Sequence, residues 1–381
     1  MNNEKDYNFD EIFEEYKSLG EIQGYLKKLG KGSFGVVNEV IYKNKICAGK
    51  LTVKDSVAER ELSEDLKGSN IIRFYKVCNP IIKYGNTYHL IIMEKAMLKD
   101  LGKLNNYFHE HNLLKLIYKN SFDKEASDTL IRYYARQIIY GLETLDKKDL
   151  VHFDIKPENI LITSSMILKL TDFSISKKIN ENINDLLIPG GTIGYITPEY
   201  YLKQPIPASE AKKQDYFSLG AALFLLKYGF TFLNHKKEDD REIIADRIVQ
   251  SLIKESNFLA SRKFVDKDFV IFLKHLLGIK PEYRYNFEQI FRSKWLNKNL
   301  EPMQKIIDNF ETDEEKFIME LQKLDSILQK NEIFEYNKTH YSKIEDNITN
   351  EETTKNKSIK RNISKNFRFK KKKDEDEYKY N

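Results

Sequence analysis

The chain has 381 residues, of which 41% are hydrophobic and 12% aromatic, so it can form a sizeable packed core. Its formal net charge is only +5, which excludes a protein whose whole surface binds polyanions. Two cysteines, Cys47 and Cys78, are too few for a disulfide framework and predict a reducing compartment. No apolar run approaches the roughly 18 residues that span a bilayer, and the polar start does not fit a secretory signal. We therefore expect a soluble cytoplasmic protein, with a nuclear location as the alternative.

The first hundred residues are predicted to be mostly β. An acidic, helix-prone leader covers about residues 1–21, and alternation of apolar and polar positions over 25–51 then predicts strand, tight turn, strand and strand. A short helical stretch follows from Ser56, with a capping box closed by Glu59. Two more strand patterns lie at 70–78 and 87–96.

From Leu101 onward the apolar residues recur at helical spacing, which predicts a mostly α part. The clearest buried face comprises Ile131, Tyr134, Ala135, Ile138, Ile139 and Leu142. Residues 109–127 carry no chemical pattern and fit either an insertion or an extended helix. The helical pattern continues over 297–334, and the polar composition beyond residue 335 predicts disorder.

Three glycines, Gly30, Gly32 and Gly35, lie in the string GKGSFGVV between two predicted strands. A dinucleotide-binding fingerprint requires a helix directly after its glycines, so the strand context argues against it. A turn without side chains lets backbone amides approach phosphates closely, while an ordinary hairpin is the plainer interpretation. Lys50 follows on the third predicted strand. There it can reach nucleotide phosphates if a carboxylate orients it.

The run VHFDIKPENILI at residues 151–162 carries the densest chemical pattern. Asp154 and Asn159 lie five residues apart across a proline-bearing loop, and Asp172 follows in LTDFS. Two carboxylates and a carboxamide suit a site for magnesium and phosphate oxygens. Three unrelated turn residues would not be expected in this order and density, so the pattern favours such a site.

The glycine string, Lys50, the run at 151–162 and Asp172 follow one another along the chain in an order that resembles a eukaryotic-type protein kinase of the serine/threonine type. The glycine loop, the strand lysine, the HFDIKPEN loop and the DFS triplet match the family's nucleotide-binding and catalytic motifs. Further on, GTIGYITPEY with Thr192 resembles the end of the activation segment, and DYFSLG resembles the aspartate motif at Asp215. KPEYRYNF carries Arg284, which the resemblance pairs with Glu199 in a buried ion pair.

The resemblance implies an α+β, bilobal protein kinase fold with a small, mostly β N-lobe and a larger, mostly α C-lobe, followed by a C-terminal helix and a disordered tail. The expected parts are the acidic leader at 1–21, the kinase domain at 22–296 with its N-lobe at about 22–96 and its C-lobe at about 97–296, a helical extension at 297–334, and a basic tail at 335–381.

The same resemblance implies roles for the matched side chains. Asp154 would orient the acceptor hydroxyl and take its proton, and Asn159 and Asp172 would hold magnesium. Lys50 would contact the α and β phosphates. The implied catalytic residues are Asp154, Lys156, Asn159, Lys50 and Thr192, of which Lys156 and Thr192 mark a serine/threonine kinase rather than a tyrosine kinase.

For ATP, the resemblance implies a gatekeeper at Met93 and adenine contacts from the backbone of the two hinge residues Glu94 and Ala96. The implied ATP-binding residues are Leu29, Gly30, Gly32, Ser33, Phe34, Gly35, Val37, Ala48, Lys50, Glu59, Met93, Glu94, Ala96 and Leu161. The carboxylate partner of Lys50 stays open: counting back from the loop at 66–70 favours Glu59, whereas the string AEREL favours Glu61. We prefer Glu59.

Two positions depart from the family pattern. Phe153 replaces the arginine that in many kinases pairs with a phosphate on the activation segment, and a phenyl ring cannot make that charge-assisted bond. We therefore expect activity not to require phosphorylation of the segment through this residue. Ser174 replaces the glycine of the triplet, so the backbone has less freedom to flip, while metal binding by Asp172 should survive.

The leading interpretation is a serine/threonine protein kinase that uses ATP and Mg²⁺ to phosphorylate protein hydroxyls. The alternative is a pseudokinase or ATP-binding scaffold, and a small-molecule or lipid kinase is disfavoured by Lys156 and the intact GTIGYITPE string. The partner expected is a protein substrate, with no specific nucleic acid and no membrane span. The basic run at 360–373 offers weak contact with anionic surfaces, although a solvated tail is the preferred interpretation. The sequence leaves the oligomeric state open.

Overall fold

A computed structural model describes residues 9–32, 35–53, 59, 70–96, 98–104, 124–163, 167–179, 184–228 and 266–298. The chain divides into two compact units, 1–314 and 315–381, and the second lies wholly outside the described residues. Several expected features also lie outside them: the helical extension from residue 299 on, the basic tail, most of the stretch at 109–127 and, apart from Glu59, the short helix after Ser56.

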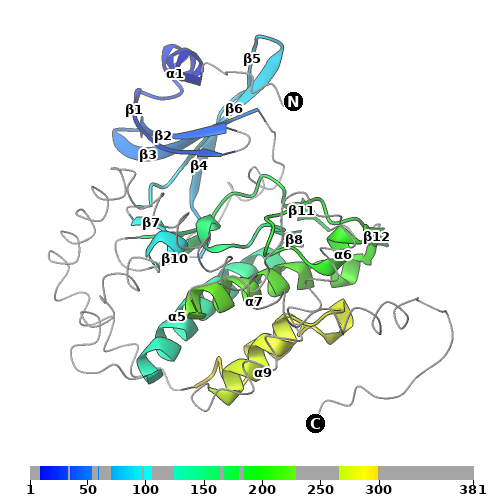
Figure 1. Ribbon diagram of the computed structural model, residues 1–381. Helices are drawn as coiled ribbons and strands as arrows, with labels where there is room; N and C mark the ends of the chain where they lie inside the picture. The colour runs from blue at the N-terminus through cyan, green and yellow to red at the C-terminus, as the bar shows by residue number, and fades with distance from the viewer. Residues whose placement is uncertain are drawn as a thin grey trace, which may run out of the picture. The chain divides into compact units, whose positions relative to one another are not determined.

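The N-terminal part forms one antiparallel sheet (Figure 1). Its strands are β1 (Gly24–Gly32), β2 (Gly35–Tyr42), β3 (Lys45–Thr52), β4 (Phe74–Val77), β5 (Ile81–Lys83) and β6 (Asn86–Met93), in the order β1-β2-β3-β6-β4 with β5 paired to β6. Lys43 and Asn44 turn β2 into β3 with φ values of 49° and 61°, the backbone of a tight two-residue hairpin. The sequence did not predict β5, because three residues are too short to show a periodic pattern.

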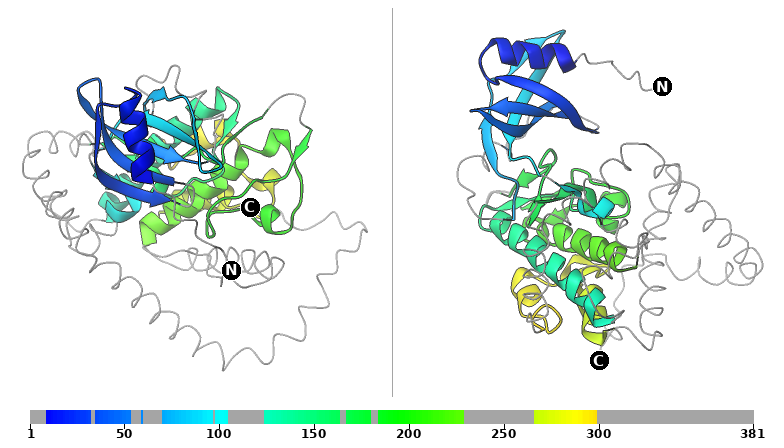
Figure 2. Two further views of the ribbon diagram at one scale, coloured as in Figure 1. Left: turned by 90° about the horizontal axis from the view of Figure 1, so that it is seen from above. Right: turned by 90° about the vertical axis from the view of Figure 1, so that its left-hand side faces the viewer.

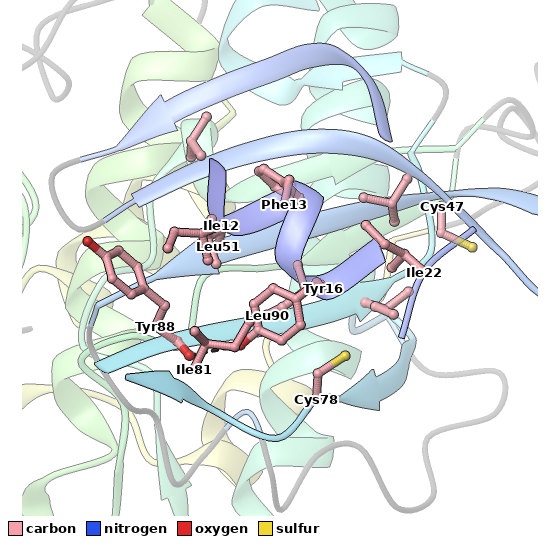
Figure 3. Close-up of a cluster of buried hydrophobic side chains, with 13 residues drawn as sticks. Ile12, Phe13, Tyr16, Ile22, Cys47, Leu51, Cys78, Ile81, Tyr88 and Leu90 are labelled. Atoms are coloured by element: carbon pink, nitrogen blue, oxygen red, sulfur yellow. Dashed lines mark hydrogen bonds between the residues drawn. The ribbon is translucent and has the colours of Figure 1, made fainter. Parts of the chain in front are cut away.

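The leader forms the helix α1 (Phe9–Ser18), which lies over the sheet in all three views (Figures 1 and 2). Its buried face packs on one side of the sheet, where Val36, Leu51 and Leu90 are cross-strand neighbours. The cluster that the helix closes comprises Ile12, Phe13, Tyr16, Ile22, Val36, Val40, Cys47, Leu51, Cys78, Ile81, Tyr88, Leu90 and Ile92 (Figure 3).

Polar and aromatic contacts fix α1 in register with the strands. The buried hydroxyl of Tyr16 donates to the carbonyl oxygens of Tyr88 at 2.8 Å and of Asn79 at 3.1 Å. The ring of Phe13 stacks on Tyr25 with centroids 5.2 Å apart. Because alternate residues of a strand point to opposite faces, α1 covers the side of β3 that faces away from Lys50.

The C-terminal part is mostly helical, as expected from the sequence. Its elements are β7 (Leu98–Asp100), α5 (Lys124–Asp146), β8 (Leu150–Val151), the 3₁₀ turn η1 (Pro157–Asn159), β9 (Ile160–Ile162), β10 (Leu168–Leu170), β11 (Lys177–Lys178), β12 (Asp185–Leu186), α6 (Pro198–Tyr201), β13 (Ile206–Pro207), the 3₁₀ turn η2 (Ala208–Glu210), α7 (Lys213–Tyr228), α9 (Lys267–Leu276), the 3₁₀ turn η3 (Pro281–Tyr283) and α10 (Phe287–Phe291).

The helix α5 confirms the face predicted from sequence, since all six of its apolar positions from Ile131 to Leu142 are buried. It packs against α7, which in turn packs against α9 (Figure 1). The two parts together form the expected α+β fold. Within the part of the chain that the structure describes, no helix is long and apolar enough to cross a membrane.

Candidate active site

The ammonium group of Lys50 on β3 contacts two carboxylates. Its Nζ lies 2.7 Å from Oε1 of Glu59 and 2.8 Å from Oδ1 of Asp172. The Glu59 side chain is buried, so this ion pair is shielded from water. The sequence favoured Glu59 over Glu61, and Glu59 is the residue at this position, whereas Glu61 lies outside the described residues.

The opposite charges of Lys50 and its carboxylate partners keep these side chains ionised. Burial acts to lower the pKa of Lys50, but the negative charges of Glu59 and Asp172 outweigh it and raise that pKa above its usual value. Burial also acts to raise the pKa of Asp172, and the positive charge of Lys50 overcomes it and holds that pKa well below its usual range. At neutral pH the site therefore combines a cation with an anion that suits a metal ion.

The second part of the site is the loop between β8 and β9. Oδ2 of Asp154 accepts hydrogen bonds from Nζ of Lys156 and Nδ2 of Asn159, each at 2.9 Å. Oδ1 of Asp154 accepts from the hydroxyl of Thr192 at 2.7 Å, and Lys156 also donates to Thr192. Four of the five catalytic residues implied by the resemblance thus form one network around a single carboxylate.

Buried groups beneath this loop fix its backbone. The carboxylate of Asp215, near the start of α7, accepts from the backbone N–H of His152 at 2.7 Å and of Phe153 at 2.8 Å. Burial raises the pKa of Asp215 to about 7, while these two donors oppose the rise. The rigid core helix α7 thereby holds the residue that precedes Asp154.

His152 connects the two loops of the site. Burial lowers the pKa of its imidazole, so the ring is neutral at pH 7. Nδ1 accepts from the backbone N–H of Asp154 at 3.2 Å, and Nε2 lies 3.0 Å from the carbonyl oxygen of Thr171, which assigns the ring proton to Nε2. We did not predict this role, although the position of His152 two residues before Asp154 was available as a signal.

Asp172 follows β10 and is placed by contacts on both sides. The N–H of Thr171 donates to the carbonyl oxygen of Asn159 at 3.0 Å, which ties the end of β10 to the η1 turn. Phe173 is fully buried, with its ring centroid 4.7 Å from that of His152 and 6.0 Å from that of Phe74. The Ser174 side chain bonds to Asp172 and helps to keep its pKa low, a contact that a glycine cannot make.

Val37 and Ala48, two of the implied ATP-binding residues, lie on β2 and on β3, the strand that carries Lys50. Val37 and Lys50 are cross-strand partners, and Ala48 is paired in the same way with Met93. Val37, Ala48 and Lys50 therefore share one face of the sheet. Leu161 lies on β9, where it pairs with Lys169.

The residues that follow β6 contact both the N-terminal sheet and the C-terminal part of the chain. The N–H of Glu94 donates to the carbonyl oxygen of Arg73 at 2.8 Å. The Glu94 carboxylate accepts from the Arg73 N–H at 2.9 Å and pairs with Lys169 at 2.9 Å. Next to it, Lys95 pairs with the buried Glu39 on β2 at 2.7 Å. These contacts were not predicted from the sequence.

The glycine loop joins β1 to β2, as predicted. A side chain at Gly35 would place its Cβ 2.0 Å from the carbonyl oxygen of Leu51, so only glycine fits this close approach of β2 to β3. Leu29 and Gly30 lie on β1, and Gly32 ends it. Ser33 and Phe34 lie outside the described residues.

The donors at this site fit a magnesium ion that is bound with a nucleotide. Within the described ranges, no group of three or more His, Cys, Asp or Glu side chains could hold a metal alone. Asp172 and the carboxamide oxygen of Asn159 offer two hard oxygen donors, and Mg²⁺ is commonly bound through one or two carboxylates together with substrate phosphates and water.

The resemblance implied a buried ion pair between Arg284 and Glu199, and the structure contains it. Arg284 Nη2 lies 2.7 Å from Oε1 of Glu199, and both side chains are buried. Arg284 Nε also donates to the carbonyl oxygen of Gly278 at 2.8 Å. This pair joins α6 to the loop before α10.

Sequence comparisons with known proteins indicate the family to which this site belongs. A family model described as protein kinase domain matches residues 24–296. A probable serine/threonine-protein kinase of Dictyostelium discoideum is 26% identical over 290 residues, covering 71% of this chain and 37% of that protein. Serine/threonine-protein kinase AtPK1/AtPK6 of Arabidopsis thaliana is 29% identical over 283 residues, covering 71% and 54%. An Aurora kinase of Candida glabrata is 27% identical over 285 residues, covering 72% and 70%.

The chain spans about half the length, or less, of the Arabidopsis and Dictyostelium relatives. The family match, in contrast, covers most of this chain and includes the Lys50, Asp154 and Asp172 positions. The chain belongs to the protein kinase family.

Proposed function

We propose that the protein is an active serine/threonine kinase that transfers the γ-phosphoryl group of ATP to protein hydroxyls. Two carboxylates and their hydrogen-bond partners carry the proposal. The Asp172 carboxylate accepts from Lys50. The Asp154 carboxylate accepts from Lys156, Asn159 and Thr192. Relatives named as serine/threonine kinases support the acceptor class.

In the proposed reaction the oxygen of the acceptor hydroxyl forms a bond to the γ-phosphorus. The bond from that phosphorus to the β,γ-bridging oxygen breaks, and its electron pair leaves with ADP. The hydroxyl proton passes to the Asp154 carboxylate. Lys156, whose Nζ lies 2.9 Å from Asp154 Oδ2, places a positive charge beside the transferred group.

The remaining residues position the nucleotide. Lys50, oriented by Glu59, binds the α and β phosphates, while Asn159 and Asp172 hold magnesium. When bound, magnesium neutralises charge on the phosphate oxygens. Positioning and electrostatic stabilisation then account for most of the rate enhancement.

The alternative of a nucleotide-binding scaffold is motivated by Phe153 and Ser174. The geometry favours catalysis over this alternative, because a scaffold has no physical need for a hydroxyl-binding network around Asp154. Nor does Ser174 displace Asp172, whose carboxylate stays on Lys50.

Transfer of labelled phosphate tests the proposal. The purified chain is incubated with Mg²⁺, γ-labelled ATP and a generic basic protein, beside Asp154→Asn. We expect label on Ser or Thr of the acceptor, and a decrease of about a hundredfold or more in the variant because the proton acceptor is lost. ATP binding should be unchanged in Asp154→Asn. Binding of ATP without transfer by either protein would instead support the scaffold.

A further inference from the structure

A buried carboxylate lies on the face of the sheet that carries Lys50. Glu39 on β2 pairs across the strands with Ala48, which lies two residues before Lys50 on β3 and therefore on the same face. Glu39 is buried, with 5% of its surface exposed. Ala48 in turn pairs with Met93, the last residue of β6. Glu39 thus lies near the end of this face where β6 leads into residues 94–96, the hinge.

Two lysines contact this carboxylate at different distances. Nζ of Lys95 in the hinge lies 2.7 Å from Oε1 of Glu39, and 28% of the Lys95 side chain is exposed. Nζ of Lys27 on β1 lies 3.7 Å from the same oxygen, and 60% of that side chain is exposed. The attraction to Lys95 is the stronger one, because the charges are closer and less screened by water. The Glu39–Lys95 pair therefore joins β2 directly to the hinge.

The surroundings of Glu39 make this pair unusual. Its neighbours on the same face, Val37, Ala48 and Met93, are apolar, and a carboxylate is costly to bury among them unless a cation compensates it. Replacement of a buried ion pair by well-packed apolar side chains is often neutral or stabilising. Stability alone is therefore a weak reason for a charge here. The pair does provide a specific geometric link between two elements.

Adjacent hinge residues are held by different parts of the fold. The N–H of Glu94 donates to the carbonyl oxygen of Arg73, and the Glu94 carboxylate pairs with Lys169 on β10 at 2.9 Å. These contacts place the hinge relative to β10. Lys95 makes the complementary contact with β2. The spacing between the hinge and β2 therefore depends on the Lys95 side chain and on its partner.

We propose that Glu39 and Lys95 are positioning residues for the adenine end of the nucleotide. Their ion pair sets the spacing between Val37, which the resemblance places against the adenine ring, and the hinge backbone, which it places at the edge of the ring. The identity of the ligand rests on the proposed function. Because Lys50 contacts the phosphates further along the same face, loss of the pair should weaken binding of the base and leave the chemical step largely unchanged.

The first test measures binding of adenosine, which carries the base but no phosphate, to the full chain by isothermal titration calorimetry. Glu39→Gln and Lys95→Met each remove one charge of the pair and keep an unbranched side chain. We expect Kd for adenosine to rise about fivefold or more in each, because the hinge then spends less time in the arrangement that fits the base.

Two further variants serve as controls for the binding test. Lys95→Arg keeps the positive charge and should bind adenosine within about twofold of wild type. Lys27→Met removes the more distant and more exposed lysine and should also stay within about twofold. Adenosine affinity close to wild type in both Glu39→Gln and Lys95→Met would overturn the proposal.

The double variant of Glu39→Gln with Lys95→Met shows whether the two side chains act together. Either single substitution already breaks the pair, so the double variant should bind adenosine no more than about twofold more weakly than the worse single variant. If the two losses multiplied instead, the residues would act independently, and the ion pair would not be the positioning element.

Steady-state kinetics separate positioning from chemistry and from general loss of structure. In Lys95→Met we expect KM for ATP to rise about fivefold or more while kcat stays within about twofold. Asp154→Asn should show the opposite pattern, with ATP binding retained and kcat lost. A tenfold fall of kcat in Lys95→Met with KM unchanged would contradict the positioning role.

Failure of this proposal can be told apart from failure of the proposed function, because adenosine binding requires no phosphate transfer. Pair-dependent adenosine binding in a chain that transfers no phosphate would support the positioning role and contradict the proposed function. Pair-independent binding in a chain that does transfer phosphate would overturn the positioning role alone. A wild-type chain that binds no adenosine would overturn the positioning role as well.

Discussion

Each oxygen of the Asp154 carboxylate has its own partners, and in the proposed reaction this division would let one residue orient the acceptor. Oδ1 accepts from Thr192, while Oδ2 accepts from Lys156 and Asn159. Hydrogen bonds of this charge-assisted kind are stronger than neutral ones and fix the plane of the carboxylate. In the proposed reaction, the acceptor hydroxyl would therefore meet an oxygen whose direction these hydrogen bonds have already set.

At the same scale, Glu59 and Glu61 provide a matched pair for testing the Lys50 contact. Glu59→Gln removes a buried charge 2.7 Å from Nζ of Lys50, and loss of such a bond costs about 1.5–3 kcal/mol. We therefore expect kcat/KM for ATP to fall by roughly 10- to 100-fold, measured by steady-state kinetics. Glu61→Gln is the control and should stay close to wild type. A larger loss in Glu61→Gln would mean that the assignment of the partner is wrong.

At the scale of elements, α1 completes the sheet that carries Lys50. The helix packs on the side of β3 that faces away from the site, with Phe13 stacked on Tyr25 and Tyr16 bonded to the backbone of Tyr88. The strand is thus supported from behind by a buried cluster. This support belongs to the leader and lies outside the residues that match the family.

Substitution of Phe13 measures the contribution of this helix. Phe13→Ala removes a fully buried ring and should lower the free energy of unfolding by about 3–5 kcal/mol. Leu19→Ala is the control, since Leu19 is 64% exposed just beyond the helix and should change stability by less than about 0.5 kcal/mol. Urea denaturation of both variants decides the question. Equal, small effects would show that α1 does not pack on the sheet in solution.

Elements with a long periodic pattern could be predicted from the sequence. The six apolar positions of α5 repeat at helical spacing and are all buried, whereas β5 has three residues and no pattern to recognise. The leader was predicted to be helical, but its partner surface was not, because α1 contacts strands up to 72 residues away through Tyr16. Local periodicity carries no information about such long-range packing.

At the scale of the whole kinase-like region, the site is assembled from segments far apart in the chain. Lys50 and Asp172 are separated by 122 residues, and Glu94 at the hinge contacts Lys169 on β10. No local pattern predicts that Lys50, Asp154, Asn159 and Asp172 share one site. That prediction came from the resemblance of the motifs, in their order along the chain, to a known family. The ion pair of Glu94 with Lys169 could not be predicted, because it depends on which side chains the fold places side by side.

The central claim is that Lys50, Asp154, Asn159 and Asp172 act on one nucleotide and its metal ion. A crystal structure with Mg²⁺ and a non-hydrolysable ATP analogue tests it most directly. The account predicts magnesium at about 2.1 Å from oxygens of Asp172 and Asn159. It also predicts Lys50 on the α and β phosphates and the γ-phosphate facing Asp154. A nucleotide bound without metal, or a metal held by other side chains, would contradict it.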